Sequence, residues 1–322
     1  MKKYSVVTAR TARALRRSIL VASAVAAGAW LAIPAGARKQ TSTGAIRVQT
    51  DLVNILASVT DSDGHPVIGL GQDAFQLSEE GVPQTIARFE AQTNRPVDLA
   101  LMVDASASAQ KDLKFELDAA AHFISQVVRP GDTLSVFEIT EDVTQLADFS
   151  GDVPKLQQAA RRISPGAGTS LYDAIALGSH ALRRRPPGRR RAIVLVTDAG
   201  ETTSVSKFED ARRAAIASET LLYAVVIRPV KNQNGRNTGG EHALITIMQS
   251  TGGGMFILDE VDQIESMFAR INEELRTQYL LGYYPHPTPP PGSDRHVHVT
   301  VVGPYEMQYR SEYFTAGRSA SR

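Results

Sequence analysis

The stretch VDLALMVDASAS, residues 97–108, decides the fold of this 322-residue chain. It contains an unbroken apolar run, Leu99–Val103, which is typical of a β-strand that is covered on both faces. The run ends at Asp104, and Ser106 and Ser108 follow it at alternate positions. In open α/β sheets, ligands bind outside the carboxyl ends of the strands. The stretch therefore predicts a buried strand whose end presents one carboxylate and two hydroxyls to a ligand.

Strand and helix patterns alternate from residue 95 to residue 276. Further strands are expected at Leu134–Ile139, Val143–Phe149 (an edge strand), Ala192–Thr197, Leu221–Ile227 and Gly254–Leu258. Helices are expected at Asp112–Val128, Val153–Ile163, Leu171–Leu182, Lys207–Thr220, His242–Ser250 and Val261–Arg276. This alternation predicts an α/β domain with a doubly wound, mostly parallel sheet of Rossmann-like type.

The segments on either side of this domain carry only strand patterns. The expected strands are Leu52–Thr60, Phe75–Ser78, Gln84–Phe89, Tyr279–Tyr284, His296–Val302 and Met307–Tyr313. Neither segment has enough strands to be stable alone. We therefore expect residues 46–94 and 277–315 to pair into one small all-β, sandwich-like domain, into which residues 95–276 are inserted. Residues 38–45 are expected to be a linker and residues 316–322 a tail.

The first 37 residues have the pattern of an export signal. Six basic residues precede or flank an apolar segment, Ile19–Ile33, and Ala35–Ala37 offers a small-residue cleavage site. Cleavage predicts a secreted, periplasmic or envelope protein, whereas an uncleaved segment would be a membrane anchor; export by the Sec or the twin-arginine route stays open. Removal of residues 1–37 takes away six basic groups and no acidic ones, so the formal net charge changes from +1 to −5. This charge argues against a nucleic-acid partner, and the absence of cysteine excludes thiolate metal sites and disulfides.

Several conspicuous polar features are interpreted as surface or turn residues. Asp61–Gly64 imitates the start of a calcium loop, but Gln72 stands where the bidentate glutamate is required, so a turn is expected. Asp98 is interpreted as a solvated residue at the start of a strand. The two arginine triplets at 183–185 and 189–191 are interpreted as an exposed loop at the end of the sheet opposite Asp104.

Five side chains are expected to meet at the carboxyl ends of the strands. They are Asp104, Ser106 and Ser108 after the first strand, Thr169 in a glycine-rich loop, and Asp198 after the strand AIVLVT. All five offer hard oxygen atoms, which suit Mg²⁺, Mn²⁺ or Ca²⁺ better than Zn²⁺ or Cu²⁺. The set leaves a coordination position that an aspartate or glutamate of a partner can fill. The alternative for Asp104 alone is an ordinary helix cap.

Three motifs carry a resemblance to a known family. D-x-S-x-S at 104–108, G-T-S-L-Y-D at 168–173 and V-T-D at 196–198 resemble the loops of von Willebrand factor type A (VWA) domains. The resemblance implies a metal-ion-dependent adhesion site (MIDAS) on a doubly wound fold. The flanking segments are similar to those of bacterial secreted VWA-related proteins of the acidobacterial type. This chain departs from the family pattern at Ala107, Ala109 and Ala199, where loop geometry is affected and ligand chemistry is not.

Two residues of the second motif have expected supporting roles. Ser170 and Asp173 are spaced as a variant of the capping box at the start of a helix, which leaves Thr169 free for the ion. Asp173 is either a residue that orients the loop behind the metal ligands or a plain acidic residue in the first turn of a helix.

The function expected from these features is metal-dependent protein binding. A divalent ion, Mg²⁺ in the first instance, would capture an acidic residue of a protein partner, and the chain would not be an enzyme. Two alternatives remain open: a structural scaffold of an envelope assembly whose site holds no ion, and a metal-dependent hydrolase. The three loops contain no histidine to act as a general base, which disfavours the hydrolase.

Overall fold

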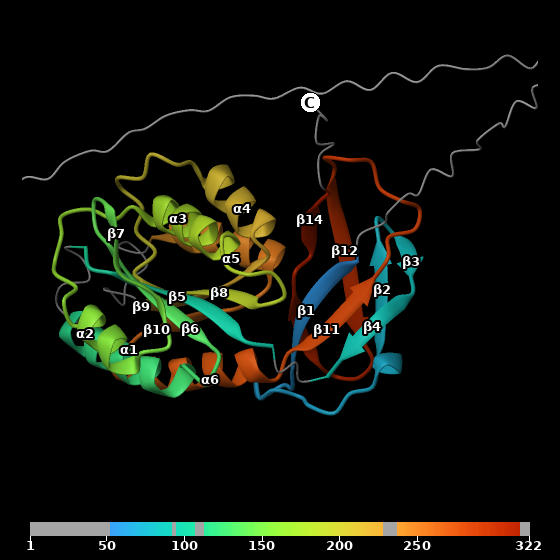
Figure 1. The fold of residues 1–322 in the computed structure, drawn as a ribbon, viewed down its shortest axis with the longest axis horizontal. Coiled ribbons are helices and arrows are strands. Elements are labelled where there is room, and N and C mark those ends of the chain that lie inside the picture. The colour runs from blue at the N-terminus through green and yellow to red at the C-terminus, as the bar shows by residue number, and fades with distance from the viewer. Residues whose placement is uncertain (1–51, 92–94, 107–112, 228–236, 316–322) are drawn as a thin grey trace, which may run out of the picture. The chain divides into compact units, whose positions relative to one another are not determined.

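A computed structural model describes residues 52–91, 95–106, 113–227 and 237–315 of the chain (Figure 1). The expected export signal, the linker, the tail and Ser108 lie outside these residues. Within the described part of the chain, no helix is both long and apolar enough to span a membrane.

A six-stranded sheet forms the centre of the α/β domain. Its strands are β5 (Val97–Asp104), β6 (Thr133–Ile139), β7 (Val143–Ser150), β8 (Arg190–Thr197), β9 (Thr220–Ile227) and β10 (Met255–Leu258). Their order across the sheet is β10-β9-β8-β5-β6-β7. Neighbouring strands are parallel except β7, which pairs antiparallel with β6 at one edge. The expected mostly parallel fold class is therefore confirmed.

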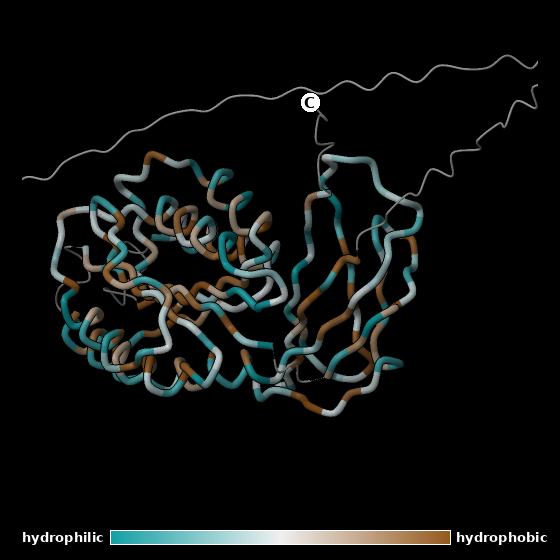
Figure 2. Tube along the Cα trace, in the orientation of Figure 1, coloured by the Kyte–Doolittle hydropathy of each residue, from teal (hydrophilic) through white to brown (hydrophobic). Residues whose placement is uncertain are grey.

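Helices cover both faces of this sheet (Figure 1). The hydrophobic cluster on one face is completed by α1 (Leu113–Val127), α2 (Val153–Ala160) and α6 (Ile264–Arg276). The cluster on the other face is completed by α3 (Leu171–Arg183), α4 (Phe208–Ala217) and α5 (Thr238–Thr251). Leu99, Leu101 and Val103 of β5 point into the first cluster, and Ala100 and Met102 point into the second. Because both faces of β5 are buried, its sequence is a continuous apolar run and does not alternate between polar and apolar residues. Figure 2 shows hydrophobic residues along the strands.

Strands from both flanks of the chain build a second, all-β part. One antiparallel sheet has the order β13-β1-β11-β4, from β1 (Val53–Thr60), β4 (Ile86–Glu90), β11 (Tyr279–Tyr283) and β13 (Glu306–Tyr309). The other has the order β14-β12-β2-β3, from β2 (Phe75–Glu79), β3 (Val82–Gln84), β12 (Asp294–Val301) and β14 (Glu312–Phe314). Each sheet takes two strands from each flank. The core between them includes Phe75, Phe89 and Tyr279, whose ring centroids lie 5.0–6.1 Å apart.

Two strands that the sequence pattern predicts as continuous are divided in the structure. Residues 84–89 were expected as one strand, but β3 pairs with β2 in one sheet and β4 pairs with β11 in the other. Residues 307–313 divide in the same way, since β13 pairs with β1 and β14 pairs with β12. At both places the chain crosses from one sheet to the other, and the alternation of polar and apolar residues does not mark the crossing.

The interpretation of Asp98 as solvated is wrong. Its carboxylate is fully buried, and it accepts hydrogen bonds from Arg189 Nε at 2.7 Å and Thr133 Oγ1 at 2.5 Å. Arg185 Nε lies 3.3 Å from the same carboxylate. Burial by itself raises the pKa of Asp98, but these donors outweigh it and leave the pKa below its usual value.

The exposed-loop interpretation of the arginine triplets is correct only for Arg184, because Arg183 is exposed but is the last residue of α3. Arg185 and Arg189 hold Asp98, and Arg190 is buried with 3% of its surface exposed. The partners of these arginines lie dozens of residues away in the chain, so a run of like charges gave no sign of them.

Candidate metal-binding site

The carboxyl ends of β5 and β8 lie side by side. The two strands are parallel neighbours in which Val103 is opposite Val196, so Asp104 and Asp198 emerge at the same edge of the sheet. Thr197 Oγ1 donates a hydrogen bond of 2.7 Å to Asp104 Oδ2 and ties the two strand ends together. Asp104 is fully buried, and Asp198 is 7% exposed.

The glycine-rich loop before α3 joins these two strand ends. Its Gly166 amide donates to the carbonyl of Ala105 at 2.8 Å, and the carbonyl of Thr169 accepts from the Thr202 amide at 2.9 Å. A methyl group placed on Gly200 would lie 2.8 Å from Asp198 Oδ1 and 3.5 Å from Thr169 Oγ1. The Thr169 hydroxyl and the Asp198 carboxylate therefore both lie beside Gly200.

Ser106 also belongs to this group. Ser106 is 2% exposed, and its amide donates to Asp104 Oδ1 at 2.9 Å, so the chain turns back over the carboxylate directly after β5. Four of the five predicted ligands, Asp104, Ser106, Thr169 and Asp198, therefore come together. Ser108 lies outside the described residues.

The electrostatics of the site favour a cation. Burial raises the pKa of Asp104, and the nearby charge of Asp198 raises it further, although hydrogen bonds from Thr197 and Ser106 act in the opposite direction. Within the described residues, no basic side chain forms an ion pair with either carboxylate. Two buried carboxylates without a counter-charge are costly to ionise. The oxygen-only donor set fits Mg²⁺, Mn²⁺ or Ca²⁺, and such an ion would balance both charges.

Asp173 holds a neighbouring loop. Its two carboxylate oxygens accept the amides of Val205 at 2.8 Å and Ser206 at 2.9 Å. Burial alone raises the pKa of Asp173, but these hydrogen bonds prevail and lower it. The contacts fix the loop that follows Asp198 and present Val205, whose side chain is 92% exposed. Asp173 therefore supports the rim of the site through the backbone.

The expected capping role of Ser170 is wrong. Ser170 occupies the N-cap position of α3, but its side chain makes no capping hydrogen bond and donates instead to the Glu141 carbonyl at 2.7 Å. The first amides of the helix are satisfied from the loop after β8. Tyr172 N donates to Glu201 Oε2 at 3.0 Å and to Ser204 Oγ at 3.1 Å.

Several residues that support the site were missed by sequence reasoning. The Glu141 carboxylate accepts the Ala167 amide at 2.8 Å, which fixes the glycine-rich loop and lowers the pKa of Glu141. Thr202 Oγ1 accepts the Thr169 amide at 2.9 Å. Thr197 offered a local signal, because it is a hydroxyl residue at the end of an otherwise apolar strand. Glu141 and Thr202 offered none, because each bonds to a residue 26–33 positions away.

The backbone that carries Asp198 is tightly confined. Ala199 adopts a left-handed conformation with φ of 62°, which costs a non-glycine residue energy and explains why glycine suits this position. A methyl group on Gly240, in the first turn of α5, would lie 1.8 Å from the Ala199 carbonyl oxygen. Only glycine at 240 therefore allows α5 to pack this closely against the residue after Asp198.

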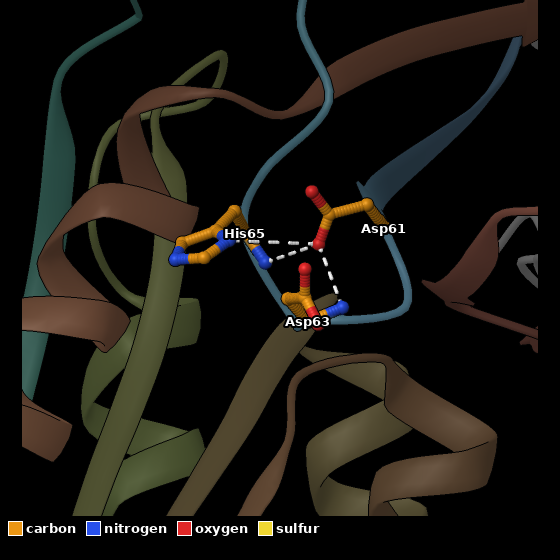
Figure 3. A group of neighbouring side chains, drawn as sticks. All are labelled: Asp61, Asp63 and His65. Atoms are coloured by element: carbon orange, nitrogen blue, oxygen red, sulfur yellow. Dashed lines mark hydrogen bonds and ion pairs between the residues drawn. The ribbon is translucent and has the colours of Figure 1, made fainter.

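A second group of polar side chains lies in the turn after β1. Figure 3 shows Asp61, Asp63 and His65 around this turn, and their potential ligand atoms lie within 4.8 Å of one another. Asp61 Oδ1 accepts the backbone amides of Asp63 at 3.0 Å and His65 at 2.9 Å. These bonds close the turn that the sequence predicts, and both Asp63 and His65 are exposed. We assign the group to the turn.

Comparison with known proteins places the fold. Residues 99–201 match the von Willebrand factor type A domain family. A von Willebrand factor type A structure from Catenulispora acidiphila is 10% identical, with a TM-score of 0.50, over 85% of this chain and 76% of that one. The similarity in fold thus extends beyond the six-stranded sheet and its helices.

Two further solved structures are similar over little more than half of this chain. The conserved hypothetical protein BatB from Bacteroides thetaiotaomicron is 15% identical over 56% of this chain and all of that one, with a TM-score of 0.44. The vWF domain of the type V pili tip protein Mfa5 from Porphyromonas gingivalis is 11% identical over 56% of this chain and 95% of that one, with a TM-score of 0.42. No curated protein matches the sequence.

Proposed function

We propose, from the premise that this chain contains a von Willebrand factor type A domain, that it is a protein-binding module that works through a divalent cation. A domain of this type fits a protein-binding role. The observation that carries the metal-dependent part is the meeting of Asp104 and Asp198, two buried carboxylates with no basic partner among the described residues.

The residues of the chain have separate tasks in this mechanism. Asp104, Ser106, Thr169 and Asp198 would hold the ion, with Ser108 as a further candidate. Mg²⁺ would supply a positive charge and an open coordination position for a carboxylate oxygen of a partner. The protein hydroxyls add no charge, so the protein ligands do not make the site net negative, and the ion keeps an open coordination position for an acidic group of the partner.

We propose binding rather than catalysis at this site. The loops that meet here, residues 104–106, 166–170 and 198–204, contain no histidine, lysine or cysteine, and Glu201 is engaged with Ser204 at 2.7 Å and with the Tyr172 amide. A metal-dependent hydrolase usually needs a general base beside the attacking water. We further propose that the chain is exported through residues 1–37 and acts in the cell envelope or outside the cell.

Calorimetric titration of the purified protein with MgCl₂, MnCl₂ and CaCl₂ tests the metal site. We expect one ion per chain, and we expect Mg²⁺ at 100 times its Kd to stabilise the fold by about 2.7 kcal/mol. Thr169→Val keeps the shape of the side chain but removes the hydroxyl, so it should weaken Mg²⁺ binding at least tenfold, whereas Thr169→Ser should bind normally. Thr144→Val, at an exposed position of β7, is the matched control. Equal affinities of Thr169→Val and the native protein would overturn the assignment.

Binding to envelope proteins tests the partner side of the proposal. Immobilised protein should retain a partner in MgCl₂ and release it in EDTA, and an excess of a glutamate-rich peptide should compete. Asp104→Asn should lose the partner while remaining folded, and Asp148→Asn, an exposed carboxylate on β7, should keep it. Retention that is indifferent to EDTA and to Asp104→Asn would exclude metal-dependent capture.

A further inference from the structure

An arginine-rich cavity lies at the end of β8 that is opposite the candidate metal site. Its volume is about 220 Å³. Among the described residues, five arginines and a single carboxylate line it: Arg95, Arg189, Arg190, Arg191, Arg310 and Glu219. We propose that this cavity binds a small oxyanion, either phosphate or the carboxylate of a small organic acid.

Three of the five arginines are already paired with a carboxylate. Arg95 Nη2 lies 3.1 Å from Glu90, Arg189 Nε lies 2.7 Å from Asp98, and Arg310 Nη1 lies 3.0 Å from Glu219. These pairs fix three guanidinium groups around the cavity, but Glu90 also pairs with Arg88 and Asp98 also pairs with Arg185, so the charges are only partly balanced. The other two arginines add further positive charge to the lining of the cavity.

Arg190 and Arg191 donate to backbone carbonyls instead of carboxylates. Arg190 Nε donates to the Arg95 carbonyl at 2.9 Å, and its Nη1 donates to the Leu275 carbonyl. Arg191 Nη1 donates to the Ser218 carbonyl at 2.9 Å, and its buried Nε has no acceptor among the residues that the structure describes. Neither forms an ion pair with a carboxylate within the described part of the chain. A carbonyl orients a guanidinium group without neutralising it, so two positive charges remain uncompensated.

The positive charge of Arg190 is unusual because the side chain that carries it is buried. Burial lowers the pKa of Arg190 to about 10, and the nearby charge of Arg276 contributes to the lowering. Asp132 opposes this effect, but it is itself engaged with Arg276 Nη2 at 2.7 Å. A bound anion would supply the counter-charge that this region lacks, as it does for other buried cations.

The size and lining of the cavity select the class of ligand. A volume of 220 Å³ corresponds to roughly seven water molecules at about 30 Å³ each, below the range of about 300–1,000 Å³ for pockets of drug-sized ligands. The planar fork of a guanidinium group matches the paired oxygens of phosphate and carboxylate. Pro187, Leu221 and Leu280 add apolar walls, which limit water and strengthen charge interactions.

The proposed anion site is independent of the metal site. Arg190 is the first residue of β8 and Thr197 is the last. A strand rises about 3.3 Å per residue, so the two sites are roughly 23 Å apart. Anion binding should therefore be unaffected by Asp104→Asn.

Titration calorimetry of the purified protein at low, constant ionic strength tests this site. Separate arms use inorganic phosphate, acetate and chloride. We expect a saturable isotherm for phosphate, for acetate or for both, which identifies the preferred oxyanion, and none for chloride. Arg191→Gln should weaken that binding at least tenfold. If Arg191→Gln fails to fold by circular dichroism, Arg95→Gln, whose side chain is partly exposed, serves as the second variant.

Arg183→Gln is the matched control, because it removes the same charge from an exposed position in the other arginine triplet. Its affinity for the anion should equal that of the native protein. The proposal is overturned if no anion binds saturably, if chloride binds as well as the oxyanions do, or if Arg183→Gln weakens binding as much as Arg191→Gln.

Discussion

Asp98 shows how a single buried carboxylate can stabilise the α/β domain. It is held by Arg189, Arg185 and Thr133, and none of its surface is exposed. We expect Asp98→Asn to lower the free energy of unfolding by about 3 kcal/mol at pH 7, because two guanidinium groups lose their counter-charge. Urea unfolding measures this difference, and Asp148→Asn on the surface should leave stability within about 0.5 kcal/mol of the native value.

The stability of the native protein and that of Asp98→Asn should depend differently on pH. The pKa of Asp98 in the folded state is below the ordinary 3.8, so its contribution is present above that value and is lost as the pH falls through the lowered pKa. The stability difference between the native protein and Asp98→Asn should therefore be constant from pH 7 to pH 5 and shrink below about pH 4. A difference that is unchanged at pH 3 would contradict the assigned role of the charge.

The sequence predicted the candidate ligands of the site, but it did not predict the residues that hold the loops of the site in place. Asp104 and Asp198 each follow an apolar strand directly, and parallel neighbours end at the same edge of a sheet, so their meeting follows from local patterns. Thr202 and Glu141 hold the second loop through single hydrogen bonds across long stretches of chain. A hydroxyl or carboxylate in a loop is compatible with many such partners, and nothing local selects one.

At the scale of elements, the start of α5 controls the loop that carries Asp198. Gly240 lies against the carbonyl of Ala199, whereas a methyl group on Gly239 would meet no atom of the described residues within 4 Å. We expect Gly240→Ala to lower stability by about 2–3 kcal/mol, the cost of overpacking, and to weaken Mg²⁺ binding through displacement of Asp198. Thermal unfolding and calorimetric titration measure the two effects.

Gly239→Ala is the matched control, since it makes the same change one residue earlier in the same helix. It should raise stability by about 0.5–1 kcal/mol, because alanine favours the helix more than glycine does. Normal Mg²⁺ binding by Gly240→Ala would show that the α5 contact does not position Asp198.

In two segments, a periodic pattern predicted one strand where the structure has two strands in different sheets. Alternation of side chains defines an extended segment, and residues 84–89 and 307–313 are extended almost throughout. Pairing depends on the neighbouring strand, and the neighbours of β4 and β13 come from the opposite end of the chain. The local pattern therefore located these strands and missed the place where each passes from one sheet to the other.

At the scale of the whole molecule, the inserted α/β domain begins and ends on paired strands. Glu90, the last residue of β4, is opposite Leu280 of β11. The chain thus leaves the all-β part and returns to it at adjacent positions, which is the geometry that tolerates a domain insertion. The sequence predicted the joint β domain because each flank has too few strands to be stable alone.

This connection predicts how the chain can be divided. Residues 95–277 contain the complete six-stranded sheet and all predicted metal ligands, so this fragment should fold and bind Mg²⁺ with the affinity of the full chain. Residues 49–94 alone should be unfolded, because β1 and β2 would each lose a neighbour that comes from beyond residue 277. A chain in which a short Gly-Ser linker replaces residues 95–277 should recover the β-sheets, since it joins β4 to its antiparallel neighbour β11 as a hairpin.

Circular dichroism and amide hydrogen exchange distinguish the folded and unfolded states of these three variants. A folded 49–94 fragment, or a linker variant without protected amides in β1 and β11, would show that the two flanks do not form one folding unit.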